Sequence, residues 1–341
     1  MRNSPSARMV FGVGCALAVA VAAQAGRASY RHQPAEPLPA AMAPRGAGCV
    51  IEAIDGGPGG DEGRLAAAGR LMAGADPGAL GISLLAAPFR GAAAKAYVPV
   101  IVEVDGGRLL AGGRSKTLAA EIYADAVGAG GVIADSFGQS LRLDTGWAGG
   151  TLRRGSLKFF GHLELPAGDY SLRVLVRNAG TGAFGKRALA VAVPAFAAGQ
   201  PVLLSPFFPE PAGRWALVRE LPRGELRDVA YPFVVGQRAY VPASLPALRP
   251  GKSIAVALVG YNLGDGRLDA RAKIQSADGR DLVGGDIRLG GRDAGGGARP
   301  AVLRAVFRPP HLVPGDYRLV VTVSGPAGAQ TGSSRFAITA R

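Results

Sequence analysis

One pattern occurs twice in this chain of 341 residues: a turn ending in Gly-Asp-Tyr that runs directly into a strand-like alternation. The first copy, LPAGDYSLRVLVR, begins at Leu165, and the second, LVPGDYRLVVTV, begins at Leu312. After Tyr170 and Tyr317, apolar and polar residues alternate with a period of two, and β-branched residues are frequent. This is typical of half-buried antiparallel strands. A chain that repeats such a strand is constrained to β-sheet architecture, built twice.

The residues before each tyrosine predict a specific kind of turn. Pro166 with Gly168, and Pro314 with Gly315, interrupt the chain just ahead of the strand. In the tyrosine corner of immunoglobulin-like sandwiches, the hydroxyl bonds to the backbone a few residues upstream. A tyrosine that merely begins a strand is the alternative. We assign structural roles to six residues: Tyr170, Tyr317, Pro166, Gly168, Pro314 and Gly315.

Short alternating segments separated by turns fill most of the chain after residue 81. Val98, Val100, Val102 and Val104 alternate with other residues and are expected to face a core. We expect no convincing helix in this region. The predicted fold class is therefore all-β, with two tandem immunoglobulin- or fibronectin-III-like antiparallel β-sandwich domains. Residues 254–259 are apolar on both faces and predict the most buried strand of the second domain.

The composition changes along the chain and suggests five segments. We predict a signal peptide at 1–25, a low-complexity, disordered linker at 26–80, a first sandwich at 81–196, a Pro-rich linker at 197–225 and a second sandwich at 226–341. In the second sandwich, the Gly-rich residues 284–297 are expected to form a mobile loop.

The N-terminal residues have the features of a secretory signal. Arg2 and Arg8 are followed by an apolar run at 9–23 and an Ala-Gln-Ala sequence at 23–25. The run is shorter than the roughly 20 residues of a membrane-spanning helix. We therefore predict export to the periplasm or the extracellular space, with an N-terminal membrane anchor as the alternative. Cleavage after residue 25 leaves Cys49 as a single thiol, which excludes an internal disulfide.

The net charge of +14 raises the question of a polyanionic partner. Basic residues, however, occur singly on predicted strand faces or in pairs such as Arg153-Arg154 and Lys186-Arg187. No aromatic stacking motif lies between them, so we predict no nucleic-acid partner. Solvated faces, or loose attraction to an acidic envelope surface, are the favoured interpretation.

The sequence contains no catalytic or metal-binding constellation. The three histidines, His32, His162 and His311, lack metal-ligand spacing, and no nucleophile elbow, P-loop or dinucleotide fingerprint occurs. Several strand-face carboxylates could in principle supply a glycosidase pair, but any sandwich has such residues. They are Glu103, Glu121, Asp125, Glu164 and Asp169. We assign no catalytic residue, no metal site and no cofactor.

Several long stretches resemble a known bacterial region. They include GISLLAAPFR, AYVPVIVEVDG, DSFGQSLRLD, FFGHLELPAGDYSLRVLVRNAG and YPFVVGQRAYVPASLPALRPGKSIAVALVGYNL. They are similar to the C-terminal β-sandwich region of proteins that carry a von Willebrand factor A-related domain, mostly from GC-rich, Acidobacteria-like genomes. The resemblance implies a preceding A domain with an Asp-x-Ser-x-Ser metal site. Residues 135–140, DSFGQS, have the wrong spacing, so metal-dependent adhesion does not transfer to this chain.

Three functions follow as hypotheses. The first is a non-catalytic exported protein, a scaffold or protein-interaction module with a protein partner in the cell envelope. Its contact surfaces would be edge strands and loops. The second is a carbohydrate-binding module using aromatics predicted to be exposed: Tyr97, Tyr123, Trp147 and Tyr261. Trp147, in the predicted loop DTGWAGG, is the strongest of these candidates. The third is a hydrolase with a convergent site. The sequence leaves the oligomeric state open.

Overall fold

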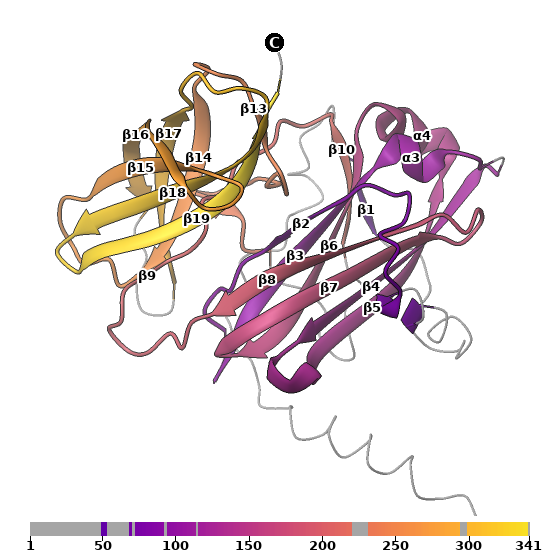
Figure 1. Cartoon of the computed structure of the whole chain (residues 1–341), viewed down its shortest axis with the longest axis horizontal. Helices are drawn as coiled ribbons and strands as arrows, with labels where there is room; N and C mark the ends of the chain where they lie inside the picture. Colours follow the sequence, from indigo (N-terminus) through magenta and orange to yellow (C-terminus); the bar gives the residue numbers. More distant parts are fainter. Residues whose placement is uncertain are drawn as a thin grey trace, which may run out of the picture. The chain divides into compact units, whose positions relative to one another are not determined.

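The computed structural model describes residues 49–52, 68–69, 72–91, 94–113, 115–219, 231–293 and 299–339. Of residues 49–52 only the backbone is described. The predicted signal peptide, and most of the predicted linker at 26–80, lie outside the described residues. The described chain is nearly all β-strand, in agreement with the predicted fold class (Figure 1).

Two sheets form the first sandwich. One contains β1 (Cys49–Glu52), β2 (Ile82–Ala86), β3 (Lys95–Asp105), β6 (Ser156–Pro166) and β10 (Trp215–Arg219), in the order β1-β10-β6-β3-β2. The other contains β4 (Thr117–Val127), β5 (Ile133–Asp144), β7 (Gly168–Asn178) and β8 (Phe184–Val193), in the order β5-β4-β7-β8. The alternating valines of β3 are buried between the sheets, as their spacing predicts.

Two helices interrupt the first sandwich, so the expectation of no convincing helix is wrong. They are α3 (Gly106–Leu110) and α4 (Thr145–Arg154), which contact each other at one end of the sandwich (Figure 1). Asp105 accepts a hydrogen bond from the Arg108 backbone N–H (2.7 Å), and Asp144 accepts one from the Gly146 N–H (2.6 Å). These N-caps satisfy donors at the helix starts and offset the low helix propensity of the glycines in α4.

The predicted Pro-rich linker at 197–225 contributes structure to the first sandwich. Its strand β10 pairs in parallel with β6, with Leu217 opposite Lys158, and β1 pairs in parallel with β10. These are parallel pairings within a mainly antiparallel fold. The domain boundaries at residues 196 and 226 remain a prediction.

The second sandwich contains a larger set of strands. They are β9 (Val202–Leu203), β13 (Ala247–Leu248), β14 (Ile254–Tyr261), β15 (Asp269–Ser276), β16 (Asp281–Asp293), β17 (Ala301–Arg308), β18 (Gly315–Gly325) and β19 (Gly328–Ile338). Their order is β13-β19-β18-β15-β16-β17-β14-β9. A small antiparallel pair, β11 (Val234–Val235) and β12 (Arg238–Ala239), precedes them.

Strand β16 joins the two layers of the second sandwich. Residues 281–285 pair with β15, whereas residues 286–293 pair with β17. The expectation of a mobile loop at 284–297 is therefore wrong for residues 284–293, and residues 294–298 lie outside the described ranges. Gly285 lies at the crossing, where a Cβ atom would approach the Phe307 ring to 2.6 Å. The glycine that suggested a loop instead admits a core aromatic ring.

The buried residues of the described ranges form three apolar clusters, and the third lies against both sandwiches. Ile101, Phe160 and Leu217 on the outer face of the β3-β6-β10 sheet belong to it, together with Ala257 and Val259 of β14. Val256 and Leu258 of β14 face the interior of the second sandwich. From Val256 onward, strand β14 is thus buried on both faces, as the sequence predicts, whereas Ala255 is exposed. Each large apolar side chain that is buried stabilises the fold by about 1.5–3 kcal/mol.

In both Gly-Asp-Tyr turns, the tyrosine hydroxyl forms a hydrogen bond with a backbone carbonyl oxygen that lies upstream in the chain. The Tyr170 hydroxyl donates to the Pro166 carbonyl oxygen at 3.0 Å, and the Tyr317 hydroxyl donates to the Val313 carbonyl oxygen at 2.9 Å. Gly168, with a φ of 150°, begins β7 in a conformation that favours glycine. This is the hydrogen-bond geometry of a tyrosine corner, present once in each sandwich.

Candidate functional site

The most unusual polar feature of the described chain is a lysine with no exposed surface. Lys158 lies on β6 between Leu157 and Phe159, opposite Glu103 of β3. Its side chain is 0% exposed. A buried ammonium group is costly unless it is paired and hydrogen-bonded, so neighbouring oxygen atoms must compensate its charge.

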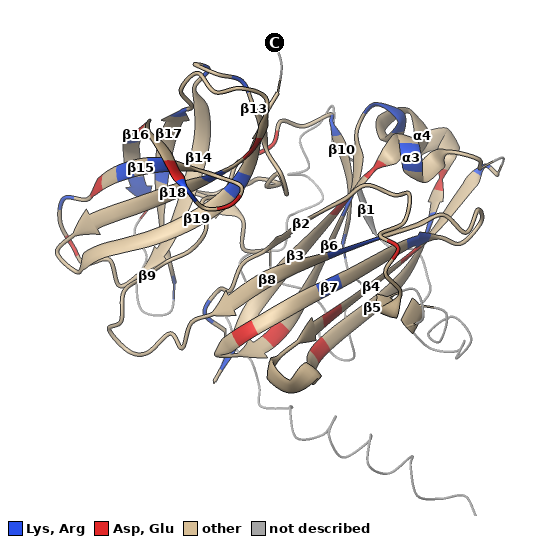
Figure 2. Ribbon diagram, viewed as in Figure 1, with Lys and Arg blue, Asp and Glu red and all other residues tan. Residues whose placement is uncertain are grey.

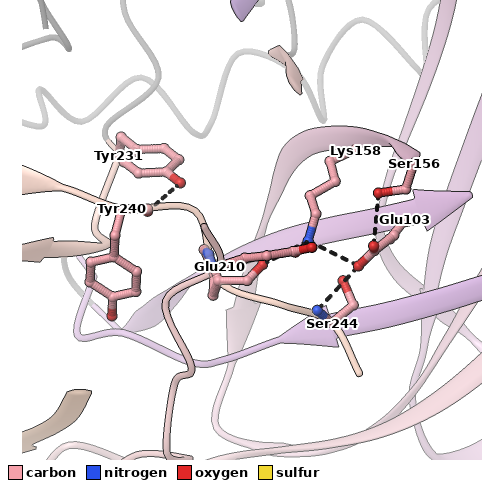
Figure 3. A network of polar contacts seen from close by, with 8 residues as sticks. Glu103, Ser156, Lys158, Glu210, Tyr231, Tyr240 and Ser244 are labelled. Carbon is pink, nitrogen blue, oxygen red and sulfur yellow. Dashed lines mark hydrogen bonds and ion pairs between the residues drawn. The ribbon is translucent and has the colours of Figure 1, made fainter. Parts of the chain in front are cut away.

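Three oxygen atoms surround the Lys158 ammonium group. They are Glu103 Oε2 at 2.9 Å, Glu210 Oε2 at 2.5 Å and the Pro242 carbonyl oxygen at 3.1 Å. Figure 3 shows the side chains of Glu103 and Glu210 converging on this nitrogen. Because a lysine ammonium has three N–H donors, three nearby oxygens match its full capacity.

Glu103 is the most heavily bonded carboxylate of the site. Besides Lys158, it accepts a hydrogen bond from the Ser156 hydroxyl (2.8 Å) and one from the Ser244 backbone N–H (3.3 Å) (Figure 3). Burial raises the pKa of Glu103, but the Lys158 charge and these hydrogen bonds outweigh burial and leave the pKa below its usual value. Glu103 is therefore a carboxylate anion at neutral pH.

Glu210 responds in the opposite direction although it also contacts Lys158. Burial raises its pKa, the Lys158 charge opposes this rise, and the net pKa lies above the usual value. The neighbouring charge of Glu103 adds to the rise. Two carboxylates thus share one lysine, and the network of hydrogen bonds favours the ionised form of Glu103 more strongly.

The site joins chain segments that are far apart in sequence. The Glu210 N–H donates to the Val241 carbonyl oxygen (2.8 Å), and the Ala243 N–H donates to the Phe208 carbonyl oxygen (2.9 Å). Residues 208–210 and 241–243 are therefore paired through their backbones, and Lys158 contacts both. Nearby, the Tyr231 hydroxyl donates to the Tyr240 carbonyl oxygen (2.8 Å), and burial raises the pKa of both tyrosines. The site therefore links these two segments, residues 208–210 and 241–243, to the first sandwich.

This arrangement does not favour catalysis by Lys158. A lysine base or nucleophile needs a neutral amine and access to a substrate. Here two carboxylates and a backbone carbonyl oxygen already contact the Lys158 nitrogen, and the side chain has no exposed surface. Lys158 was not among the residues predicted to form a site. The sequence pattern that could have identified it is a lysine inside LKFFGHLEL, where the consecutive Phe159 and Phe160 predict that both faces of the strand are covered.

The aromatic candidates for sugar binding do not form one exposed set. Trp147 is 58% exposed, but it lies on α4 rather than in a loop. Tyr261 is buried, so its expected exposure is wrong: its ring lies beneath the Arg90 guanidinium at 5.0 Å, and its hydroxyl accepts a hydrogen bond from the Arg90 N–H (3.0 Å). Tyr97 is half-buried and packs against the His162 ring, and Tyr123 is half-buried as well.

Two other carboxylates considered for catalysis, Glu121 and Asp125, face basic side chains, whereas Glu164 lies opposite Tyr97 and Asp169 lies opposite Ala192. Glu121 is buried on the outer face of β4 and pairs with Arg177 at 3.3 Å. Asp125 lies opposite Arg173 of β7. Burial raises the pKa of Asp125, and the Arg173 charge opposes that rise. Among the residues described, no group of three or more His, Cys, Asp or Glu side chains could hold a metal ion.

Within the same ranges, none of the helices has the length and apolarity needed to cross a bilayer. No protein-family profile and no curated protein matches the chain.

Solved structures with partial similarity are β-domains of several kinds. The fibronectin(III)-like modules of Clostridium thermocellum CbhA are 12% identical, with 76% of this chain and 94% of that chain covered and a TM-score of 0.20. The C-terminal domain of the antigen I/II-family protein AspA of Streptococcus pyogenes is 7% identical, with 77% and 100% covered and a TM-score of 0.21. Such scores carry no argument about function, and the β-sandwich assignment depends on the strands and pairings described above.

Proposed function

We propose that this chain is a non-catalytic exported protein of the cell envelope whose sandwich domains act as a scaffold or protein-interaction module. The export part of the proposal depends on the sequence features of residues 1–25, which are typical of a signal peptide. The resemblance to a region that follows a von Willebrand factor A-related domain remains a prediction and fits an envelope location.

The observation that supports a non-catalytic role is the state of the Lys158 site. Its charged groups are used to bind one another and the backbone, and the lysine has no exposed surface. By contrast, broad strand faces such as those of β15 and β18 carry exposed side chains. A protein with a closed polar centre and open sheet faces is suited to contact other proteins through those faces.

Photo-crosslinking in intact cells tests this proposal. The photoreactive residue p-benzoylphenylalanine replaces, one at a time, three exposed residues on different strands: Ala190 of β8, Ala255 of β14 and Thr331 of β19. We expect a discrete crosslinked product at one or more positions, in the envelope fraction only. Loss of the product when the same variant is irradiated as purified protein is the control. Absence of position-dependent products at all three positions would refute the proposal.

Export is tested separately by sequencing the N-terminus of the mature protein from the envelope fraction. Cleavage after Ala25 is expected. An uncleaved chain in the cytoplasmic fraction would contradict the export part while leaving the interaction part to the crosslinking result.

Carbohydrate binding is the alternative function, and the exposed indole of Trp147 favours it. A glycan array with the full chain and a Trp147→Ala variant tests this alternative. Binding that the variant abolishes would establish it, and an array without signal would remove it. Phe137 is unsuitable as a control because it is buried in the core, whereas the exposed Ile133→Ala variant keeps the indole intact and is a matched control.

A further inference from the structure

The second sandwich presents a flat face with an excess of positive charge. We use the name basic face for the outward side chains of β15, β18 and β19. Inward residues of β18, such as Leu319 and Val321, are buried in the core, so the alternate residues point outward. Four of these outward residues are basic and exposed: Arg271, Lys273, Arg318 and Arg335. Figure 2 shows the Lys and Arg colouring along β15.

The strand register brings two arginines directly opposite each other. Arg318 of β18 faces Arg335 of β19 on one side and Gln275 of β15 on the other. Like charges directly opposite in an antiparallel pair destabilise a sheet. Nothing in the core requires this arrangement, since both side chains are exposed.

Acidic neighbours neutralise only part of the basic face. Lys273 pairs with Asp281 at 3.0 Å, and Arg335 approaches Asp316 at 3.9 Å. Within the described ranges, neither Arg271 nor Arg318 forms an ion pair. The face therefore keeps two arginines whose guanidinium groups are available to an external carboxylate.

The outward residues of the first sandwich have a different charge pattern. Its strand β7 follows the same Gly-Asp-Tyr turn and also carries outward arginines, Arg173 and Arg177. Each lies opposite a carboxylate of β4: Asp125 faces Arg173, and Glu121 faces Arg177. The corresponding neighbour of β18 is β15. Counted from the shared turn, its Lys273 takes the place of Asp125, its Arg271 that of Tyr123, and its Asp269 that of Glu121. The outward arginines of β7 thus lie opposite carboxylates, whereas Arg318 of β18 lies opposite Gln275 and Arg335.

We propose that the basic face docks an acidic, extended segment of a partner protein. Three of its four basic residues are arginines, which bind carboxylates in a bidentate manner and are enriched at protein interfaces, where lysine is depleted. Half-buried Val320 lies in the middle of the face, between Lys273 and Ser333, and offers an apolar centre. The outward positions of the three strands hold no aromatic ring for stacking a nucleobase.

The spacing of the basic residues favours an extended peptide. Arg271 and Lys273 are two residues apart on one strand, which separates them by about 6.8 Å. Alternate carboxylates of an extended acidic segment have the same spacing. This inference depends on the proposed function and names the surface and the partner chemistry for it.

Binding of a defined probe tests the basic face. The probe is a fluorescein-labelled peptide of six Glu-Thr repeats, and its anisotropy is measured with the full chain at low ionic strength. We expect the double variant R271E/R318E to bind about tenfold more weakly. The matched variant R142E/R187E reverses two exposed arginines of the first sandwich and changes the net charge equally. It is expected to bind within about twofold of the unmodified chain, because its changes lie outside the face.

Thermal unfolding of the Arg318→Glu variant provides a second measurement. It tests the like-charge pair of Arg318 and Arg335 independently of peptide binding. The substitution replaces a like-charge pair with an opposite-charge pair across β18 and β19. It should therefore raise the melting temperature of the protein and weaken binding of the probe peptide. Arg142→Glu lies opposite Ala119 and should change neither property appreciably. A lower melting temperature for R318E would contradict the like-charge argument.

The outcomes separate this inference from the proposed function. Equal loss of probe binding in both double variants would show that binding depends only on the net charge of the protein. This result would overturn the inference. Tighter binding of polygalacturonate, or of vesicles containing anionic lipid, than of the peptide at equal charge would overturn it in favour of those surfaces. Crosslinks at Ala190 or Ala255 with none at Thr331 would refute only the proposal that the basic face binds a partner. The proposal that the protein is an interaction module would still hold.

Discussion

The two sandwiches share a strand, a turn and a tyrosine hydrogen bond, but they place their charges in opposite ways. The first sandwich buries a lysine, Lys158, among carboxylates and backbone oxygens beneath the connecting segments. The second keeps its ionic groups on an exposed sheet face, where Arg318 lies opposite Arg335. The repeated element therefore determines the fold, while the outward side chains of each sheet determine whether its face is covered by the chain itself or exposed to solvent.

The covering of the sheet explains this difference. In the first sandwich, Phe207, Tyr231, Phe233, Val241 and β14 pack over the outer face of β3, β6 and β10. A charge on that face must therefore find its partners inside the protein. The outer face of β15, β18 and β19 has exposed basic side chains and can keep unpaired charge in water.

Removing one charge from equivalent pairs should affect the two sandwiches very differently. The Lys158–Glu103 and Lys273–Asp281 pairs have similar lengths, 2.9 and 3.0 Å, but the first lysine is fully buried and the second is 68% exposed. Glu103→Gln leaves a buried ammonium partly uncompensated and should lower the free energy of unfolding by about 3 kcal/mol. Asp281→Asn should have a much smaller effect, because water solvates both groups. Urea unfolding at pH 7 measures both.

Equal losses for these two variants would show that burial does not distinguish the sandwiches. A circular dichroism spectrum of each variant at zero urea is the control, since it confirms that both begin from the folded state.

The pH dependence of stability should separate the two carboxylates of Lys158. The pKa of Glu103 is lowered in the folded protein, so its contribution is present above its unfolded pKa and is lost as the pH falls through the folded pKa. The pKa of Glu210 is raised, so its contribution is present below its unfolded pKa and is lost as the pH rises through the folded pKa. Glu103→Gln should therefore reduce the gain in stability between about pH 4 and 7, and Glu210→Gln should increase it.

Urea midpoints of both variants and the unmodified chain, taken across this pH range, provide the measurement. At pH 7, Glu210→Gln is expected to cost less than Glu103→Gln, although Glu210 is the nearer carboxylate to Lys158 Nζ. Superimposable pH profiles for the two variants would contradict the assignment of opposite pKa directions.

Local patterns made much of the fold predictable from the sequence. The period-two valines of β3 and the apolar residues of β14 identified buried strands, because alternation directly reports which faces are covered. The helix α4 was missed because its start depends on one capping side chain, Asp144, within a Gly-rich segment. The strand β16 was missed because Gly285 was interpreted as a loop residue, although it makes room for Phe307.

The candidate site depended on contacts between distant segments and was not predicted. Nothing near Lys158 in the sequence identifies Glu210 or Pro242 as partners, since the backbone pairing of residues 208–210 with 241–243 brings them there. The parallel pairing of β10 with β6 is equally non-local. The burial of Lys158 could in part have been predicted from the sequence, because the consecutive apolar residues after it indicate a strand covered on both faces.

The smallest expected difference concerns the feature that the sandwiches share. Tyr317 is only 8% exposed, whereas Tyr170 is half-buried and its hydroxyl bond is open to solvent. Tyr317→Phe should therefore lower the free energy of unfolding by about 1 kcal/mol, and Tyr170→Phe by less, because water replaces the lost bond more readily there. Urea unfolding of the two variants measures the difference. A larger loss for Tyr170→Phe would mean that the first turn contributes more to stability than its exposure predicts, and that the two corners differ in more than solvent access.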